Sequence, residues 1–267
     1  MNKKILTSSA LAALSLCTLG HSAIYSSNFN SPGYSVGDLD GQNGWVTSDT
    51  GTDVAYVEDQ SLTGWPGSYG QVASIGYVDT LSTSQPYTYH NVNTPFIQDY
   101  LTTFSVEMVI RDSSNTAPDR DGFGFRLENS SGDNLFSLEF DPISQSGAPS
   151  GSTRFDTVSW SSGATTGSTP YLLQEDSRWK FDIVFYGSGV NDIGFMATLT
   201  GVGSVNFSGV LPGVASESIT RMGAFWDAGG SSGDNYMQFD NISLVPEPSS
   251  ALLIALGAAV TLRRKRD

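Results

Sequence analysis

Apolar and polar residues alternate with a period of two along much of the middle of the chain. The clearest examples, in which every second residue is apolar, lie at 104–110, 123–127, 136–140, 179–185 and 193–199. Successive side chains of a strand point to opposite faces, so each segment predicts a strand with one buried and one largely polar face, as in an antiparallel sheet. No segment of this middle region keeps the apolar period of a helix.

Gly, Asn, Asp and Ser separate these segments at short intervals. Residues 129–133 and 187–192 predict hairpin loops between consecutive strands. About a dozen strands within about 222 residues are typical of one all-β domain, here residues 24–244, built as a two-sheet antiparallel sandwich. The further strands are predicted at 24–29, 54–57, 71–78, 154–160, 204–208, 219–226 and 235–244.

The beginning of the chain carries a different pattern. Residues 1–23 combine two lysines, an apolar run and small residues at the end, which predicts a signal helix cleaved between Ala23 and Ile24. Cys17 leaves a lipoprotein interpretation open, although Leu16 before it is larger than lipidation favours. We therefore expect export through the Sec pathway.

Residues 245–267 form a second distinctive end. Pro246 and Pro248 lack amide protons and predict a stiff, non-helical boundary before an apolar run at 249–262. That run would rise about 21 Å as a helix, against a hydrocarbon core of roughly 30 Å, so it predicts a short hydrophobic helix that holds the chain in a membrane only transiently. The cations that follow would stay on the cytoplasmic side: Arg263, Arg264, Lys265 and Arg266.

The order of tripeptide, apolar run and basic end at 245–266 resembles the PEP-CTERM sorting signal of bacterial exported proteins. The resemblance implies that Pro246, Glu247 and Pro248 are recognised by an exosortase, a membrane-embedded transpeptidase. It also implies a Gram-negative bacterium that makes extracellular polysaccharide. The protein would be held briefly in the inner membrane and then delivered to the cell surface or the extracellular matrix.

The body of the chain resembles a second known group. The segments 38–45 and 239–244 are similar to those of PEP-CTERM proteins with concanavalin A-like bodies, and the order of motifs resembles the jelly roll of laminin-G and lectin domains. This resemblance covers 24–244. It implies a jelly-roll sandwich in which the closing strand pairs near the first one, at 24–29.

Composition narrows the chemistry of the body. Cys17 is the only cysteine and leaves with the signal, which excludes disulfides, zinc-thiolate sites and cysteine nucleophiles from the mature chain. His90 is then the only histidine, so a zinc site or catalytic triad around it has little support. Residues 24–245 hold seven Lys and Arg against 25 Asp and Glu, a formal charge of −18, which opposes binding to nucleic acid.

Glycoside hydrolysis is the enzyme function that such a body suggests, and it needs two suitably spaced carboxylates. Glu139 and Asp141 alternate along one predicted strand, so they share a face, but Ile143 occupies the place of a third acidic residue. Because the set is incomplete, we expect no catalytic residue. Glu139 is the carboxylate to test if the chain is a divergent hydrolase.

Two acidic loops are candidate calcium sites, because calcium prefers oxygen ligands. Asp38, Asp40 and Asn43 lie in one Gly-rich loop, and Asp119 and Asp121 lie in another. Neither loop has the spacing of an EF-hand. The alternative is that Asp and Asn stabilise turns by bonding to their own backbone.

Aromatic residues in the loop-rich section 61–95 leave two interpretations open. Trp65, Tyr69, Tyr87 and Tyr89 could stack on sugar rings or cover a sheet edge, and we favour the second. Together these observations predict an exported surface or matrix protein with a non-catalytic β-sandwich body. The alternatives are a carbohydrate-binding module that acts in extracellular polysaccharide and a divergent glycoside hydrolase.

Overall fold

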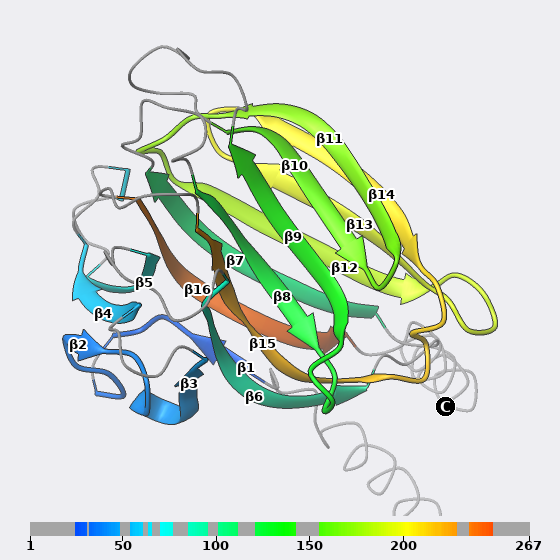
Figure 1. Ribbon diagram of the computed structural model, residues 1–267, viewed down its shortest axis with the longest axis horizontal. Coiled ribbons are helices and arrows are strands. Elements are labelled where there is room, and N and C mark those ends of the chain that lie inside the picture. Colours follow the sequence, from blue (N-terminus) through cyan, green and yellow to red (C-terminus); the bar gives the residue numbers. More distant parts are fainter. Residues whose placement is uncertain are drawn as a thin grey trace, which may run out of the picture.

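The computed structural model consists of two antiparallel β-sheets packed face to face, as Figure 1 shows. This arrangement confirms the all-β, two-sheet fold that the alternating pattern predicts. The structure describes residues 25–30, 32–48, 54–60, 64–65, 70–76, 85–95, 101–111, 121–142, 155–228 and 235–247.

The larger sheet has nine strands. Their order is β14-β13-β12-β7-β16-β5-β4-β2, and β1 also pairs with β16. The paired strands run antiparallel. The strands are β1 (Tyr25–Ser27), β2 (Gly37–Asp38), β4 (Ala55–Asp59), β5 (Gln71–Gly76), β7 (Leu101–Arg111), β12 (Trp179–Gly187), β13 (Ile193–Thr200), β14 (Ser204–Leu211) and β16 (Tyr236–Glu247).

The smaller sheet has seven strands in the order β11-β10-β9-β8-β15-β6-β3, again with antiparallel pairs. A short 3-10 turn, η1 (Gln42–Gly44), leads into the edge strand β3. The strands are β3 (Trp45–Thr47), β6 (Tyr87–Pro95), β8 (Gly122–Glu128), β9 (Asn134–Pro142), β10 (Phe155–Ser162), β11 (Thr165–Leu173) and β15 (Ser218–Asp227).

Most strands lie where the alternating pattern predicts them, but the pattern misses β2, β3, β6 and β11. The strands β2 and β3 are only two and three residues long, too short to show a period. The strand β6 has polar residues on both faces, so its sequence shows no apolar alternation and predicts a loop. The strand β11 contains Gly167 and Pro170 and pairs only with β10 at the sheet edge, where a proline is tolerated because one row of N–H groups has no neighbouring strand.

The core between the sheets is rich in aromatic side chains. Phe136 of β9 packs edge-on against Phe185 and Phe195 of the opposite sheet, with ring centroids 5.3 and 5.1 Å apart. Trp160 of β10 also packs edge-on against Phe195, at 5.0 Å. These contacts hold the two sheets together near the edge strands β11 and β14, which lie next to each other.

The first and last described strands lie side by side. Tyr25 pairs with Leu244, which confirms the expected pairing of the closing strand with the first. A β-bulge interrupts β16 after Asp240, where Asn241 adopts a left-handed conformation with φ 49°. The bulge lies where the neighbour of β16 changes from β5 to β1.

The expected signal helix at 1–23 and the short hydrophobic helix at 249–262 lie outside the described residues.

Within the part of the chain that is described, no helix has the length and apolar character needed to cross a bilayer.

Candidate functional site

A groove of about 510 Å³ lies over β9, β10 and β11 of the seven-stranded sheet. It is on the outer face, away from the core, because Glu139 alternates with the buried residues Leu138 and Phe140. We call this the β9–β11 groove. Its lining consists mainly of hydroxyl and carboxyl side chains: Ser137, Glu139, Asp141, Ser159, Trp160, Ser161, Thr166, Gly167 and Ser168.

Two glycines of the neighbouring strand β8 make room beside the groove. A Cβ atom at Gly122 would lie 2.7 Å from Oε1 of Glu139 and 3.4 Å from Cβ of Asp227. A Cβ atom at Gly124 would lie 2.0 Å from the carbonyl oxygen of Leu138 and 2.5 Å from the ring of Phe225. Because both positions lack side chains, the Glu139 carboxyl can lie over β8 and approach Asp227 of β15.

The carboxyl group of Glu139 titrates near neutral pH because of its surroundings in the groove. Burial raises the pKa of Glu139 to about 7, and the charges of Asp141 and Asp227 and a hydrogen bond with Asp227 act in the same direction. Burial also raises the pKa of Asp141, although the hydroxyl of Ser159 donates a hydrogen bond to this carboxylate and opposes the shift. Glu139 is therefore partly protonated at neutral pH, in a groove that also holds Asp141.

A cluster of arginine and aromatic side chains continues the same outer face over β8, β15 and β6. Glu128 lies between Arg126 and Arg221, with a nitrogen of each guanidinium 3.6 Å from the carboxylate. Arg126 lies over the ring of Phe225 at 4.8 Å, and Arg221 lies over the ring of Tyr89 at 4.9 Å. Burial raises the pKa of Glu128, and the two arginines oppose this shift.

The sequence singled out Glu139 and Asp141, and the structure places both in the groove. The third position, Ile143, lies outside the described residues. Sequence reasoning missed Asp227, because it comes from β15, far along the chain, and reaches Glu139 only through the pairing of β9 and β15 with β8. No local motif carries that information.

The first candidate calcium loop is held by internal hydrogen bonds. Asp38 accepts a hydrogen bond from the backbone N–H of Asp40 at 3.0 Å, and Asp40 accepts one from the N–H of Thr47 at 2.7 Å. The side chain of Asn43 donates to the hydroxyl of Tyr34 at 3.1 Å. These contacts fit the alternative in which Asp and Asn stabilise a turn.

In the second candidate loop, Asp121 is buried and accepts a hydrogen bond from the side chain of Asn235 at 2.9 Å. Asp119 lies outside the described residues. The described ranges contain no group of three or more His, Cys, Asp or Glu residues placed to hold a metal ion. Calcium binding stays a prediction from the sequence.

The aromatic residues of section 61–95 are mostly covered. Trp65 is buried and donates a hydrogen bond to Gln238 at 2.9 Å, and Tyr87 is buried beneath Arg126. Tyr89 is half-buried under Arg221, and Tyr69 lies outside the described residues. Trp65 and Tyr87 are thus buried within the protein and do not present a free face to a sugar ring.

His90 packs against the ring of Tyr25, with centroids 4.0 Å apart, and its Nε2 lies 3.1 Å from the carbonyl oxygen of Asn43. Burial lowers its pKa. These contacts give His90 a packing role between β6 and the first segments of the chain.

The sorting residues are only partly described. Pro246 pairs with Thr102 and Glu247 pairs with Leu101, so the first two residues of the tripeptide continue β16 beyond the expected end of the sandwich at 244. Pro248, Arg263–Arg266 and the cleavage position at Ala23 and Ile24 lie outside the described residues.

Comparison with protein-family models and with curated proteins gave no match. Among solved structures, a complex of peanut lectin with a 9-residue peptide matches with a TM-score of 0.50 and 14% identity, over 83% of this chain and 97% of the lectin. A carbohydrate esterase of the Shiga toxin-encoding bacteriophage phi24B matches with a TM-score of 0.53 and 10% identity, over 86% of this chain and 100% of the esterase. At these identities the likeness shows the fold, which is a lectin-like jelly-roll β-sandwich.

Proposed function

We propose that the body of this protein binds extracellular polysaccharide, and that the β9–β11 groove is its binding site. The observation that carries this proposal is the lining of the groove, in which Ser137, Ser159 and Ser161 stand beside Glu139 and Asp141. Hydroxyl groups donate and accept hydrogen bonds, and carboxylate groups accept them, so both can bind the hydroxyl groups of a sugar. The groove lies on a paired sheet, so its polar groups are held in place by the strands rather than by mobile loops.

The proposal includes delivery outside the cell. Residues 1–23 supply the export signal, and the tail at 245–267 supplies the sorting signal that an exosortase would recognise. The formal charge of −18 in residues 24–245 favours solubility of the exported body. Extracellular polysaccharide is therefore the partner that unites the groove with the two terminal signals.

Affinity electrophoresis through gels that contain neutral or acidic polysaccharides tests the proposal. The purified protein should be retarded by at least one polysaccharide. The double variant Glu139→Ala, Asp141→Ala should lose affinity by about tenfold, equivalent to about 1.4 kcal/mol. The control Ser208→Ala changes an exposed hydroxyl on β14 of the other sheet and should bind normally. Absence of retardation by every polysaccharide would overturn the proposal.

A divergent hydrolase is the second candidate, and the raised pKa of Glu139 favours it. A carboxyl group with a pKa of about 7 is partly protonated at neutral pH, as a general acid must be, and Asp141 offers a second carboxyl group in the same groove. This candidate requires release of new reducing ends from a polysaccharide that the protein binds. If Glu139→Gln leaves the rate of release unchanged, Glu139 is not the general acid.

A further inference from the structure

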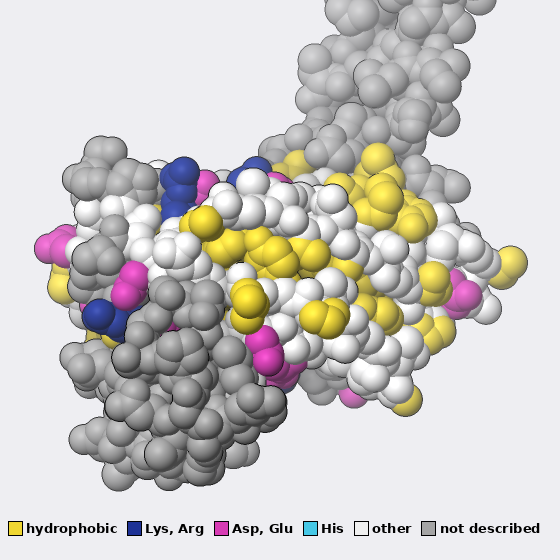
Figure 2. All heavy atoms as spheres, turned by 90° about the horizontal axis from the view of Figure 1, so that it is seen from above, with side chains coloured by type: hydrophobic (Ala, Val, Ile, Leu, Met, Phe, Trp, Pro, Cys, Tyr) yellow, Lys and Arg dark blue, Asp and Glu magenta, His cyan; other side chains and the backbone are white. Residues whose placement is uncertain are grey.

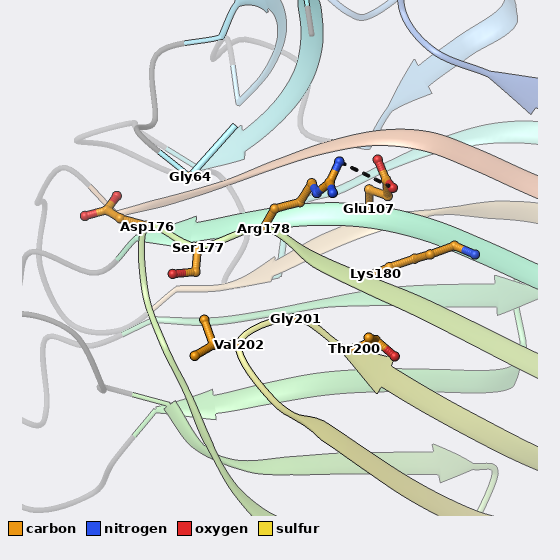
Figure 3. Close-up of a pocket in the computed structure, with 9 residues that line it drawn as sticks. All are labelled: Gly64, Glu107, Asp176, Ser177, Arg178, Lys180, Thr200, Gly201 and Val202. Carbon is orange, nitrogen blue, oxygen red and sulfur yellow. Dashed lines mark ion pairs between the residues drawn. The ribbon is translucent and has the colours of Figure 1, made fainter. Parts of the chain in front are cut away.

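A second recess, of about 640 Å³, lies on the outer face of the nine-stranded sheet. Its floor includes Glu107, Lys180 and Thr200, which are cross-strand neighbours on β7, β12 and β13. These residues alternate with the buried side chains of the core, so they face away from the β9–β11 groove. Figure 3 shows the guanidinium of Arg178 turned toward Glu107, with Thr200 at the end of β13 and Val202 on the turn that follows. We call this the β12 recess.

Close backbone packing builds the walls of the β12 recess. A Cβ atom at Gly64 would lie 2.6 Å from the carbonyl oxygen of Asp176, and one at Gly201 would lie 2.4 Å from the ring of Trp179. Asp176 itself adopts a left-handed conformation with φ 53°. The recess is therefore a shaped part of the fold and not a space between long, freely moving side chains.

Two cations, Arg178 and Lys180, line the β12 recess together with two acidic residues, Glu107 and Asp176, although Lys and Arg are scarce in the body of the chain. Residues 24–245 contain only seven Lys and Arg, and few appear on the face shown in Figure 2. Arg178 and Lys180 are about half exposed, at 43% and 51% of their side chains. Both cations already have carboxylate partners, since Arg178 lies 4.0 Å from Glu107 and Nζ of Lys180 lies 2.9 Å from Asp182. Exposed ion pairs contribute little to stability, so an incoming anion can take the place of either carboxylate at little cost.

We infer that the β12 recess is a second glycan site, which binds the carboxylate or sulfate group of an acidic sugar residue. The inference rests on the proposed polysaccharide function and names the class of sugar. The guanidinium of Arg178 matches the two oxygens of a carboxylate, the ammonium of Lys180 can turn from Asp182 to the same anion, and Thr200 offers a hydroxyl group. Val202, exposed by 67%, forms an apolar lip that a sugar ring can cover.

The two sites lie on the outer faces of opposite sheets, so one molecule can hold two polysaccharide chains. A chain in the β9–β11 groove cannot reach the β12 recess without passing around the sandwich, because the packed core separates them. A protein with this arrangement links chains and does not merely coat one. Mixtures of the protein with an acidic polysaccharide should therefore become turbid or viscous, whereas each component alone stays clear.

The substitutions Val202→Asp and Val190→Asp form a matched test. Both residues are exposed, at 67% and 88%, and both changes add one negative charge. Val202 lies in the β12 recess, whereas Val190 lies in the loop at the opposite ends of β12 and β13, about 30 Å away along the strand. Val202→Asp should weaken binding to polygalacturonate about tenfold, and Val190→Asp should bind like the unchanged protein.

Salt, competing anions and neutral polysaccharides provide further tests of the acidic-sugar site. Binding of polygalacturonate should fall as sodium chloride is raised, because the Debye length is about 10 Å at 0.1 M salt and shorter above it. Equal binding by the two valine variants overturns the inference, and so does displacement of polygalacturonate by inorganic phosphate as readily as by free galacturonate. Retardation by neutral polysaccharide alone also overturns it but leaves the proposed function standing. If no polysaccharide binds, both fail.

Discussion

Glu139 occupies the space that a side chain at Gly122 would fill, since a Cβ atom there would lie 2.7 Å from its Oε1. The side chain of Glu139, on β9, therefore lies over β8 and brings its carboxyl group to Asp227 on β15. The acidic centre of the groove therefore depends on a residue that has no side chain.

Alanine at the two outer-face glycines of β8 should have unequal effects on the free energy of unfolding. Gly124→Ala places Cβ against the backbone of Leu138, which cannot move aside, so we expect a loss of at least about 2 kcal/mol. Gly122→Ala meets only the end of the Glu139 side chain, which can swing away, so we expect a loss below about 1 kcal/mol. Denaturant unfolding measures both, and equal losses would contradict this geometry.

The stability of the protein should fall as pH rises through about 7, in part because of Glu139. Its pKa in the folded protein is about 7, above the value of 4.5 for an unburied glutamate, so the folded state binds the proton more tightly. The resulting stabilisation is complete below about pH 4.5 and is lost as Glu139 ionises. Glu139→Gln should reduce the difference in unfolding free energy between pH 5 and pH 8, by on the order of 1–3 kcal/mol. An unchanged difference would show that Glu139 titrates normally.

Asp240, in the nine-stranded sheet, should also make the stability of the protein fall as pH rises. It is 2% exposed, and burial raises its pKa to about 7, with the charge of Glu107 adding to the shift. Asp240→Asn replaces a carboxylate that ionises in a buried place with a neutral group of the same shape. We expect the variant to be more stable than the unchanged protein at pH 8, by about 1–2 kcal/mol, and similar to it at pH 5. A loss of stability at pH 8 would mean that the charge is needed there.

Processing of the tail should leave the last strand intact. Pro246 and Glu247 belong to the ladder between β16 and β7, so a cut before them would remove paired residues from the sheet. We expect the mature chain from its native host to end after Glu247 and to lack Arg263–Arg266. Intact-mass measurement identifies both ends of the mature chain. Retention of Arg263–Arg266 would refute processing, and an end before Pro246 would refute the protective role of the ladder.

The alternating pattern by itself was sufficient for the class of fold and for most strands. Phe104, Val106 and Met108 are all buried in the core, and the polar residues between them face outward. This succeeds because the period of a strand is local: each side chain points opposite to the next, whichever strand lies beside it. The same period of two correctly predicts that Glu139 and Asp141 share one face of β9. It failed for β6 and β11, whose residues lack a clear apolar face.

The tertiary structure decided everything that depends on which strands are neighbours. Asp227 meets Glu139 only because β9 and β15 both pair with β8, and Lys180 lies beside Glu107 and Thr200 only because β12 pairs with β7 and β13. Hydrogen bonds between strands join residues far apart in the chain, and the period of two carries no record of the partner strand. The sequence therefore determined the β-sandwich, and it predicts a signal at each end of the chain. Strand pairing determined the acidic groove on one face and the β12 recess, with its paired acidic and basic residues, on the other.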